Sequence, residues 1–473
     1  MVHFGTSGWR GIVGQDFTFR EVRLVMESAL FVLRELGEEA EILVSYDTRL
    51  LSAKFANEAV AVCTHHGWPV VISDRDVPTP CLAYQVRHRG AGLGVMFTAS
   101  HNPPEYNGIK LFTRNGAAPC DLTDKIEAEV RRRSPVFDDF FVPQKHLAST
   151  LPLGDDYLAA LQDGIDWDAI RRGGVRLVID PLFGTAREFL DRLLLANGVQ
   201  TAVLHNTKDP YFGGYSPECT PKNLEVLRER VRETRAHLGL ATDGDADRFG
   251  VVDDACRVVP ANLAVALLVE YLVNRRRVRG GIGRTLGTTR LVDRIAAGAG
   301  LPVRETLVGF SHFGPLFAAG DIVLAVEESA GLGLASHLPE RDGIFAALLV
   351  AEMIAVERQP VQDLVRRLFS RYGTRLNRRM DLPWRERTRH ALDRLHKERF
   401  KEFFGRRVVR EDRRDGLFLE LEGDAWVLVR RASTEPRLRL YAEATSSGEL
   451  RALVRDLRRV VRRAEEGDRN VLH

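Results

Sequence analysis

Ser100 is the first residue whose position suggests chemistry. It lies in the string TASHNPPEYNGIK, residues 98–110, directly after an apolar segment that is typical of a strand. Pro103 and Pro104 exclude an immediate helix, so we predict a sharp, exposed turn. A serine hydroxyl at such a turn can act as a nucleophile if a base or a metal ion eases its deprotonation, and Lys110 can return to the same place across the turn. For the serine alone, an ordinary polar turn is the alternative.

Three carboxylates alternate along DGDADR, residues 243–248, at Asp243, Asp245 and Asp247. Alternate side chains of a loop can converge on one hard cation, and carboxylate oxygens suit Mg²⁺ or Ca²⁺. A calcium-binding EF-hand would need glycine and glutamate where this chain has Arg248 and Asp254. Arg248 beside the carboxylates is typical of a site that also holds a phosphate. A structural turn built from aspartates is the alternative.

Two further loops carry weaker signals. GTSGWRG, residues 5–11, combines small residues, which let the backbone approach a phosphate, with Arg10, whose guanidinium can bind one. EESAG, residues 327–331, follows an apolar segment and offers the carboxylate of Glu327 and the hydroxyl of Ser329 to the hydroxyl groups of a sugar. A helix N-terminus explains this second string equally well.

RRASTEPRLR, residues 430–439, follows a predicted strand in the most basic part of the chain. Arg430, Ser433 and Thr434 could form a pocket for an oxyanion, with Arg439 nearby. Residues 374–473 hold 26 basic and 18 acidic side chains, a local excess of +8, whereas the whole chain has a net charge of +3. This region could clamp an acidic ligand, or it could be a solvated surface.

The segments that must position these loops alternate between helical and strand patterns over the first 330 residues, as in α/β proteins. Three successive α/β segments each end a strand in one of the polar loops, and ligands of open α/β sheets gather at the carboxyl ends of strands. VRLVIDPLFGTA, residues 175–186, is predicted to be a strand, a turn and the start of a helix. From about residue 372, strands and a final basic helix at 447–466 predict a smaller α+β domain.

The composition limits the classes of protein. A chain of 473 residues predicts about three or four domains. No apolar run approaches the roughly 20 residues of a membrane span, and no signal peptide is visible, so we expect a cytoplasmic protein without a membrane partner. The balanced charge argues against nucleic-acid binding. Five cysteines without a CxxC pair favour free thiols in a reducing compartment.

In this order and at these spacings, the five motifs resemble the α-D-phosphohexomutase family, most closely its bacterial and archaeal phosphoglucomutase/phosphomannomutase type. The resemblance runs from Gly5 to about residue 465, and the pairing of TASHNP…NGIK with DGDADR is highly specific. It implies an α/β fold class, with three related α/β domains of mixed sheets plus a smaller C-terminal α+β domain around one central cleft. We predict four domains: residues 1–148, which carry the phosphoserine loop around Ser100; 149–253, which carry the metal-binding loop DGDADR; 254–371, which carry the sugar-recognition loop EESAG; and 372–473, which carry the phosphate clamp RRASTEP.

The resemblance also implies a role for each matching residue. Ser100 would carry the phosphoryl group and would bind one Mg²⁺ together with Asp243, Asp245 and Asp247. Arg10 and Lys110 would act in general acid–base catalysis, supported by His101. The substrate would be bound by Arg248, Glu327, Ser329, Arg430, Ser433, Thr434 and Arg439.

The implied reaction interconverts hexose 1-phosphate and hexose 6-phosphate through a phosphoserine enzyme and a hexose 1,6-bisphosphate, with glucose 1,6-bisphosphate as activator. EESAG favours glucose phosphates, and mannose phosphate is a plausible second substrate. Phosphoglucosamine mutase is the alternative within the family, although its usual acidic loop is DGDGDR. A non-catalytic phosphosugar-binding homologue and a Mg²⁺-dependent phosphatase are the alternatives from other classes. We expect small-molecule sugar phosphates as partners and a monomer or homodimer.

Two regions depart from the family pattern. The family clamp loop reads Arg-x-Ser-x-Thr-Glu-Pro, and an ungapped match places Arg430 at the arginine and Ala432 at the serine. A gap of one residue would use Arg431 and Ser433 instead; we prefer the ungapped match because Arg430 directly follows the strand-like AWVLV. Ser311 and Arg341 stand where related sequences often carry lysine, and only Arg341 keeps the charge.

Overall fold

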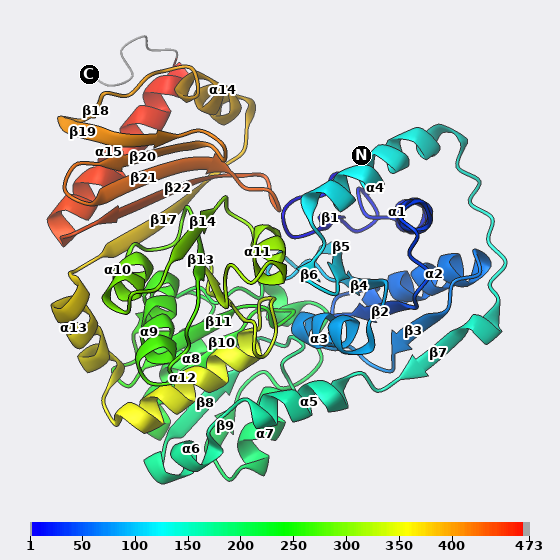
Figure 1. The fold of residues 1–473 in the computed structure, drawn as a ribbon, viewed down its shortest axis with the longest axis horizontal. Helices are drawn as coiled ribbons and strands as arrows, with labels where there is room; N and C mark the ends of the chain where they lie inside the picture. Colours follow the sequence, from blue (N-terminus) through cyan, green and yellow to red (C-terminus); the bar gives the residue numbers. More distant parts are fainter. Residues whose placement is uncertain (1, 467–473) are drawn as a thin grey trace.

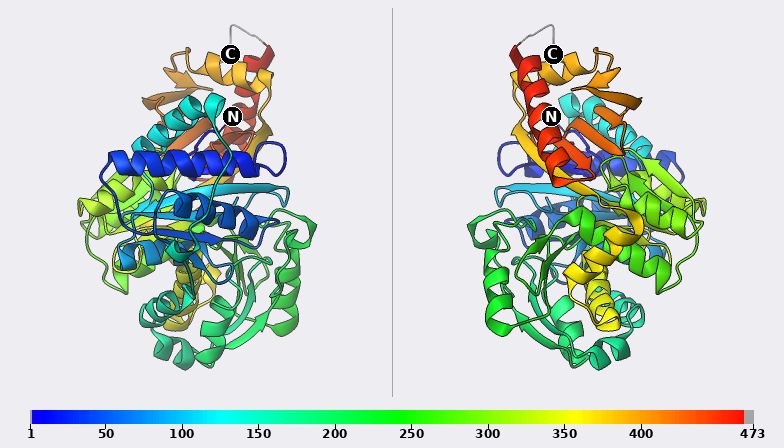
Figure 2. Two further views of the ribbon diagram at one scale, coloured as in Figure 1. Left: turned by 90° about the vertical axis from the view of Figure 1, so that its right-hand side faces the viewer. Right: turned by 90° about the vertical axis from the view of Figure 1, so that its left-hand side faces the viewer.

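Four β-sheets organise the chain in the computed structural model, which describes residues 2–466 (Figure 1). The first three sheets mix parallel and antiparallel strands, and the fourth is antiparallel throughout. The predicted α/β class, with three related domains and a smaller α+β domain, is confirmed. Figure 2 shows the fourth sheet and its helix α15 at one end of the molecule and the elements of the second sheet at the other.

The first sheet has the strand order β1-β5-β4-β2-β3-β7, with the short β6 paired to β5. β2, β3, β4 and β7 are parallel, whereas β5 is antiparallel to both β1 and β4. β7 crosses the boundary predicted at residue 148 and pairs with β3. The elements are β1 (Trp9–Ile12), α1 (Phe19–Glu35), β2 (Ile42–Tyr46), α2 (Ser52–His65), β3 (Val70–Ser73), α3 (Thr79–Arg89), β4 (Leu93–Phe97), β5 (Tyr106–Thr113), β6 (Gly116–Ala117), α4 (Cys120–Arg133), η1 (Ser134–Val136), η2 (Lys145–Leu147) and β7 (Ala148–Leu151).

The second sheet has the order β12-β11-β10-β8-β9, in which β8, β9 and β10 are parallel. β11 is antiparallel to β10, so the acidic loop lies in the turn of a hairpin. The elements are α5 (Gly154–Asp163), α6 (Trp167–Gly173), β8 (Arg176–Asp180), α7 (Leu190–Ala196), β9 (Gln200–Val203), η3 (Phe212–Gly214), α8 (Glu225–Thr234), β10 (Leu238–Thr242), β11 (Phe249–Asp253) and β12 (Val258–Val259).

The predicted start of a helix within residues 175–186 is wrong, because α7 begins only at Leu190. Leu182 and Phe183 have φ values of 49° and 59°, which lie outside the right-handed helical region. Gly184 packs against the acidic loop so closely that a Cβ there would lie 2.5 Å from the carbonyl oxygen of Gly244. The segment after β8 is therefore a loop that supports the metal-binding loop.

The third sheet has the order β14-β13-β15-β16, with β16 antiparallel to β15 and the other pairs parallel. Helix α12 of the third domain is buried along residues 343–355. Its apolar side chains belong to the largest hydrophobic core, which is shared by the first three domains. The elements are α9 (Ala261–Asn274), β13 (Ile282–Thr285), α10 (Leu291–Gly298), β14 (Val303–Thr306), η4 (Phe310–His312), α11 (Gly314–Ala318), β15 (Leu324–Glu327), β16 (Gly331–Leu334), α12 (Gly343–Glu357) and α13 (Val361–Tyr372).

The fourth sheet has the order β17-β22-β21-β20-β19-β18. One face packs against α15 in a separate hydrophobic core, and the other face carries Trp426 and Tyr441 toward the third domain. Among residues 2–466, no helix is both long and apolar enough to cross a membrane. The elements are β17 (Leu376–Pro383), α14 (Glu386–Leu395), β18 (Glu402–Phe403), β19 (Arg406–Asp412), β20 (Leu417–Leu421), β21 (Ala425–Arg431), β22 (Arg437–Ala444) and α15 (Ser447–Glu466).

Each of the first three sheets contains a hairpin of the same kind, and its turn carries candidate site residues. A fully buried strand that has a parallel neighbour turns back into an antiparallel strand, in the pairs β4–β5, β10–β11 and β15–β16. The turns between them carry Ser100, the three aspartates and Ser329. EESAG is thus a hairpin turn rather than a helix N-terminus, and three equivalent turns face one region.

Candidate active site

Ser100 lies in the turn after β4, where its φ of 52° falls in the left-handed region. Its Oγ donates a hydrogen bond to Asp243 Oδ2 at 2.7 Å, and its backbone N–H donates to Thr98 Oγ1 at 2.8 Å. The side chain is fully buried, which corrects the predicted exposed turn. The cause is cover from other domains: Asp243 comes from the second domain, and the carbonyl of Thr434 in the fourth accepts from Asn102 Nδ2 at 3.3 Å.

Arg49 holds the serine turn in place through hydrogen bonds to its backbone. Its guanidinium donates to four backbone carbonyl oxygens of the turn at 2.6–3.0 Å, those of Ser100, Asn102, Pro103 and Tyr106. Its Nε lies 3.2 Å from Asp47 Oδ2, and neither side chain is exposed. Sequence reasoning missed Arg49. The available signal was the charged string DTR directly after β2, because β2 is parallel to β4 and both strands end at the same edge.

The three aspartates of the metal-binding loop converge as predicted. Each offers a carboxylate oxygen within 4.8 Å of the other two, and all three side chains are buried. Burial and the neighbouring Asp247 and Asp245 raise the pKa of Asp243 well above its usual value. The Oδ1 atoms of Asp245 and Asp247 are buried and have no hydrogen-bond partner within residues 2–466. Converging, unpartnered carboxylate oxygens of this kind fit a hard cation such as Mg²⁺.

Three cationic side chains partly neutralise this acidic site, and one hydroxyl donates a hydrogen bond to it. Lys110 Nζ donates to Asp245 Oδ2 at 2.5 Å and to Asp247 Oδ2 at 2.6 Å, and Thr79 Oγ1 donates to Asp245 Oδ2 at 2.5 Å. Although burial opposes it, Arg341, Lys110 and Arg248 hold the pKa of Asp247 below its usual value. Lys110 thus returns to the metal-binding loop across the hairpin.

Arg341 joins the metal-binding loop to the sugar-recognition loop. Its Nη2 lies 3.0 Å from Asp247 Oδ2, and its Nη1 donates to Glu327 Oε1 at 3.0 Å. Ser329 Oγ donates to the same Glu327 oxygen at 2.6 Å. Arg341 is absent from the predicted site residues, although it stands where related sequences often carry lysine and keeps that charge. Ser311, the other departure, lies with its Oγ 3.9 Å from Cys120 Sγ of the first domain.

Arg10, His101 and Arg248 surround the serine. Arg10 Nη1 donates to Asn102 Oδ1 at 2.6 Å, and burial together with Arg248 lowers the pKa of Arg10 to about 10. Arg248 Nη1 lies 3.1 Å from His101 Nδ1, which is 3.4 Å from Ser100 Oγ. Burial and Arg248 lower the pKa of His101 well below its usual value, so this imidazole is neutral at pH 7.

The clamp loop reaches the serine turn from the fourth domain. Ser433 Oγ lies 3.0 Å from Thr6 Oγ1, and Glu435 Oε1 lies 4.0 Å from His101 Nε2. Glu435 also pairs with the buried Arg439. The loop before β1, which carries Thr6, the clamp loop and the serine turn therefore meet at one place, and Arg10 follows in β1 itself rather than in the predicted loop.

Arg430 and Arg431 occupy opposite faces of β21. Arg430 is buried, and its Nε donates to both carboxylate oxygens of Asp415 at 3.0 Å. Arg431 is exposed, with its guanidinium 5.2 Å from the centre of the Trp384 ring. Only Arg430 is thus directed into the interior of the molecule.

The chain matches one protein family over most of its length. The phosphoglucomutase/phosphomannomutase family matches in four consecutive parts: alpha/beta/alpha domain I at residues 1–136, domain II at 155–256, domain III at 260–372 and the C-terminal domain at 389–460. The chain is 31% identical, over 95% of both chains, to a "Probable phosphoglucosamine mutase" of Methanothermobacter thermautotrophicus. This chain belongs to the phosphoglucomutase/phosphomannomutase family.

Two further relatives agree with this membership. A phosphoglucomutase/phosphomannomutase of Thermococcus kodakarensis is 28% identical over 95% of this chain and 96% of its own. The crystal structure of a "putative phosphomannomutase" from Thermus thermophilus superposes with a TM-score of 0.84 at 31% identity, over 98% of this chain and 99% of that chain. As a family member, this mutase is an intramolecular phosphotransferase.

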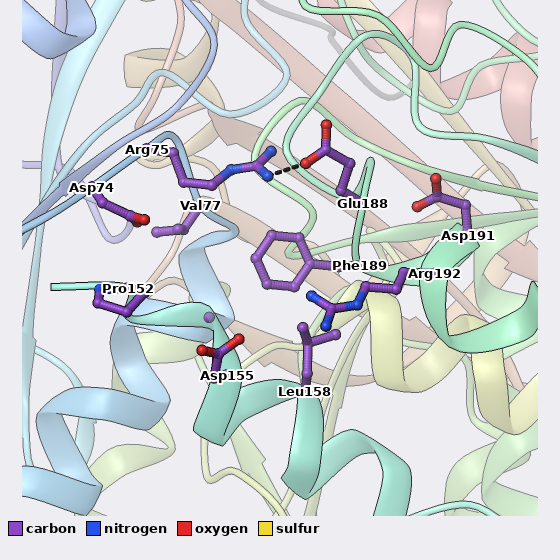
Figure 3. A pocket seen from close by; sticks show the side chains of 11 residues that line it. Asp74, Arg75, Val77, Pro152, Asp155, Leu158, Glu188, Phe189, Asp191 and Arg192 are labelled. Carbon is purple, nitrogen blue, oxygen red and sulfur yellow. Dashed lines mark hydrogen bonds and ion pairs between the residues drawn. The ribbon is translucent and has the colours of Figure 1, made fainter. Parts of the chain in front are cut away.

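A cavity of about 500 Å³ lies between the second, third and fourth domains of the mutase. Asp243, Arg248 and Ser329 line it, so it opens beside the metal-binding and sugar-recognition loops. A separate cavity of about 390 Å³ lies between the first two domains, where Arg75 pairs with Glu188 (Figure 3). None of the predicted site residues lines this second cavity.

Proposed function

We propose that this mutase interconverts hexose 1-phosphates and hexose 6-phosphates by way of a phosphoryl group carried on Ser100. The observation that carries the proposal is the buried Ser100 Oγ, which donates to Asp243 Oδ2 at 2.7 Å beside two further aspartates. A hydroxyl that hydrogen-bonds to a carboxylate within a candidate cation site is suited to accept and return a phosphoryl group.

One Mg²⁺ would be held by Asp243, Asp245, Asp247 and the phosphorylated Ser100. When bound, the ion would neutralise charge on the phosphoryl group during transfer. Lys110 and Arg341, which contact Asp245 Oδ2 and Asp247 Oδ2, would supply further positive charge. This charge balance supports transfer, because phosphoryl transfer depends chiefly on positioning and neutralisation.

In the forward half-reaction, the bond between phosphorus and Ser100 Oγ breaks and a bond to a sugar hydroxyl oxygen forms. The sugar hydroxyl gives up a proton and Ser100 Oγ takes one up; we propose that Arg10 and Lys110 carry out this general acid–base work, Lys110 as the donating cation, with His101 in support. The second half-reaction returns the other phosphate of the bisphosphate to Ser100. Burial of Ser100 keeps water away from the phosphoryl group, which favours transfer over hydrolysis.

The sugar and its non-reacting phosphate need separate sites. We propose that Glu327 and Ser329 bind the sugar hydroxyls, and that Arg248, Arg430, Ser433, Thr434 and Arg439 bind the phosphates. The exposed position of Arg431 supports the ungapped match, in which Arg430 begins the clamp. The domain boundaries, a cytoplasmic location and a monomer or homodimer stay predictions.

Glucose phosphate is the proposed substrate, because EESAG favours it. Glucosamine phosphate is the second candidate, since relatives named phosphoglucosamine mutase share 31% and 28% identity with this chain. The test is to compare kcat/KM for the 1-phosphates of glucose, mannose and glucosamine, with Mg²⁺ and the matching 1,6-bisphosphate as activator. We expect glucose 1-phosphate to be converted fastest; preference for the amino sugar would assign the second function. Absence of turnover with all three would contradict the mutase proposal.

A further inference from the structure

Arg430 is buried, yet its side chain uses only one of its three nitrogens in hydrogen bonds. Nε donates to both oxygens of Asp415, and between residues 2 and 466 neither Nη atom has a hydrogen-bond partner. A guanidinium bound at Nε keeps its two Nη groups for a second anion. The planar guanidinium can then bind a phosphate through its two Nη groups, provided that another side chain holds its orientation.

The turn that carries Asp415 is built for close approach to Arg430. Asp415 and Gly416 connect β19 to β20, and Gly416 has a φ of 91°. A Cβ on Gly416 would lie 2.2 Å from the carbonyl oxygen of Val429 and 2.8 Å from Cα of Arg430. Both the positive φ and the lack of space require glycine, so the turn lies directly against the start of the clamp loop.

Asp415 also contacts the third domain. The backbone N–H of Val308, in the loop after β14, donates to Asp415 Oδ2 at 3.0 Å. The carboxylate therefore accepts hydrogen bonds from the clamp arginine of its own domain and from a loop of the neighbouring domain. Its position depends on both contacts.

We propose that Asp415 is a positioning residue for the phosphate clamp. It holds Nε of Arg430 so that the two Nη groups remain available to the non-reacting phosphate, and it links this orientation to the contact between the fourth and third domains. The inference rests on the proposed function, in which Arg430 binds that phosphate. A carboxylate that merely competed with the phosphate for Arg430 would have the opposite effect on KM.

The test is a double-mutant cycle with Asp415→Asn, Asp415→Ala and Arg430→Ala, measured as steady-state kinetics with glucose 1-phosphate. We expect Asp415→Ala to raise KM about tenfold, the cost of one hydrogen bond to a charged group, with little change in kcat. Asp415→Asn keeps the shape and one accepting oxygen, so its KM should lie between those of Asp415→Ala and the wild type. In the Arg430→Ala background, either substitution should change KM less than about twofold, because the effect passes through Arg430.

Asp412→Ala is the matched control. Asp412 ends β19 three residues before Asp415 and pairs with Arg410 and Arg414 rather than with the clamp. Its KM should stay near the wild-type value. Glucose 6-phosphate binding to the same variants in a Ser100→Ala background, by calorimetry, measures affinity without turnover and should follow KM.

Four results would overturn the inference. A KM that falls in Asp415→Asn would identify a competitor for Arg430 rather than a positioning residue. An Asp415 effect that persists at full size in the Arg430→Ala background would show a role that does not pass through the clamp. A near-normal KM for Arg430→Ala would reject the role of Arg430 in the proposed function, and the inference with it. An impaired Arg430→Ala together with normal Asp415 variants would leave the role of Arg430 intact and reject only the inference.

Discussion

The serine turn and the clamp loop are both polar, but they are held in different ways. Ser100 and the three aspartates are buried, and Ser100 and Lys110 of the first domain donate hydrogen bonds to the aspartates of the second. The clamp loop is partly exposed, and Ser433 contacts the first domain through one hydroxyl pair, with Thr6. One end of the site is fixed for chemistry, whereas the other depends on how the fourth domain lies against its neighbours.

This difference separates the expected kinetic effects. Groups near Ser100 act on the reacting phosphoryl group and should change kcat. Groups of the clamp hold a phosphate equally in the ground and transition states and should mainly change KM. Variants at the two ends therefore test the comparison directly.

Ser100→Ala should have the largest effect. Loss of the hydroxyl that we propose carries the phosphoryl group should lower turnover by roughly a factor of 10⁴ or more. The coupled conversion of glucose 1-phosphate to glucose 6-phosphate measures it, and an unchanged circular dichroism spectrum checks the fold. Near-normal turnover would reject the assignment of Ser100.

Asp245→Asn should come next. It removes one charge from the candidate cation site without changing its size, so kcat should fall by roughly a hundredfold or more. EDTA should abolish the wild-type activity and added Mg²⁺ should restore it, as a titration of rate against free Mg²⁺ would show. An enzyme that is indifferent to EDTA would exclude the metal site.

Arg49→Met tests whether the serine turn depends on its support. Removing Arg49 leaves Asp47 buried without its ion-pair partner, which should cost about 3–5 kcal/mol of stability in the first domain. Urea unfolding followed by tryptophan fluorescence measures this loss. Arg89→Met is the control, because its ion pair with Glu41 is partly exposed and should contribute about 0–1 kcal/mol. Equal losses in the two variants would contradict the account.

Arg430→Ala should lower kcat/KM about tenfold to a hundredfold, mainly by raising KM. The substitution removes one charged hydrogen-bonding partner of the phosphate, whose loss should cost about 1.5–3 kcal/mol of binding free energy. Arg431→Ala should be close to the wild type, because Arg431 lies over Trp384 on the exposed face. If Arg431→Ala is the impaired variant, the gapped match of the clamp loop is correct.

Thr6→Val should have the smallest effect. It removes the hydroxyl pair with Ser433, which should cost about 0.5–1.5 kcal/mol in the seating of the fourth domain. We expect a KM increase of about twofold to tenfold and an unchanged kcat. A large fall in kcat instead would show that the clamp loop also positions the reacting end.

The sequence predicted the parts of this molecule that depend on local pattern. Apolar strands that end in polar loops predicted the positions of Ser100, the three aspartates and EESAG at strand ends, and the order of elements predicted the α/β class. The burial of Ser100 was not predicted, because it arises from domains more than a hundred residues away. The late start of α7 was missed because Leu182 and Phe183 have left-handed backbones that no sequence pattern indicated.

The residues that sequence reasoning missed act across domains or on backbone groups. Arg49 binds carbonyl oxygens, Thr79 reaches Asp245 of another domain, and Arg341 bridges two loops. Such contacts follow from the packing of the domains and have no fixed sequence spacing. Ser433 lies in a loop that contacts Thr6 of the first domain. The choice between Arg430 and Arg431 as the clamp arginine stays a prediction, which their opposite orientations support.

The most direct test of the central claim is the intact mass of the protein after incubation with glucose 1,6-bisphosphate and Mg²⁺. The wild type should gain the mass of one phosphoryl group, and peptide mapping should locate it on Ser100. Subsequent addition of glucose 1-phosphate should remove the group as bisphosphate forms. The Ser100→Ala protein should gain nothing. A phosphoryl group on another residue, or an unmodified wild type that still turns over, would contradict the account.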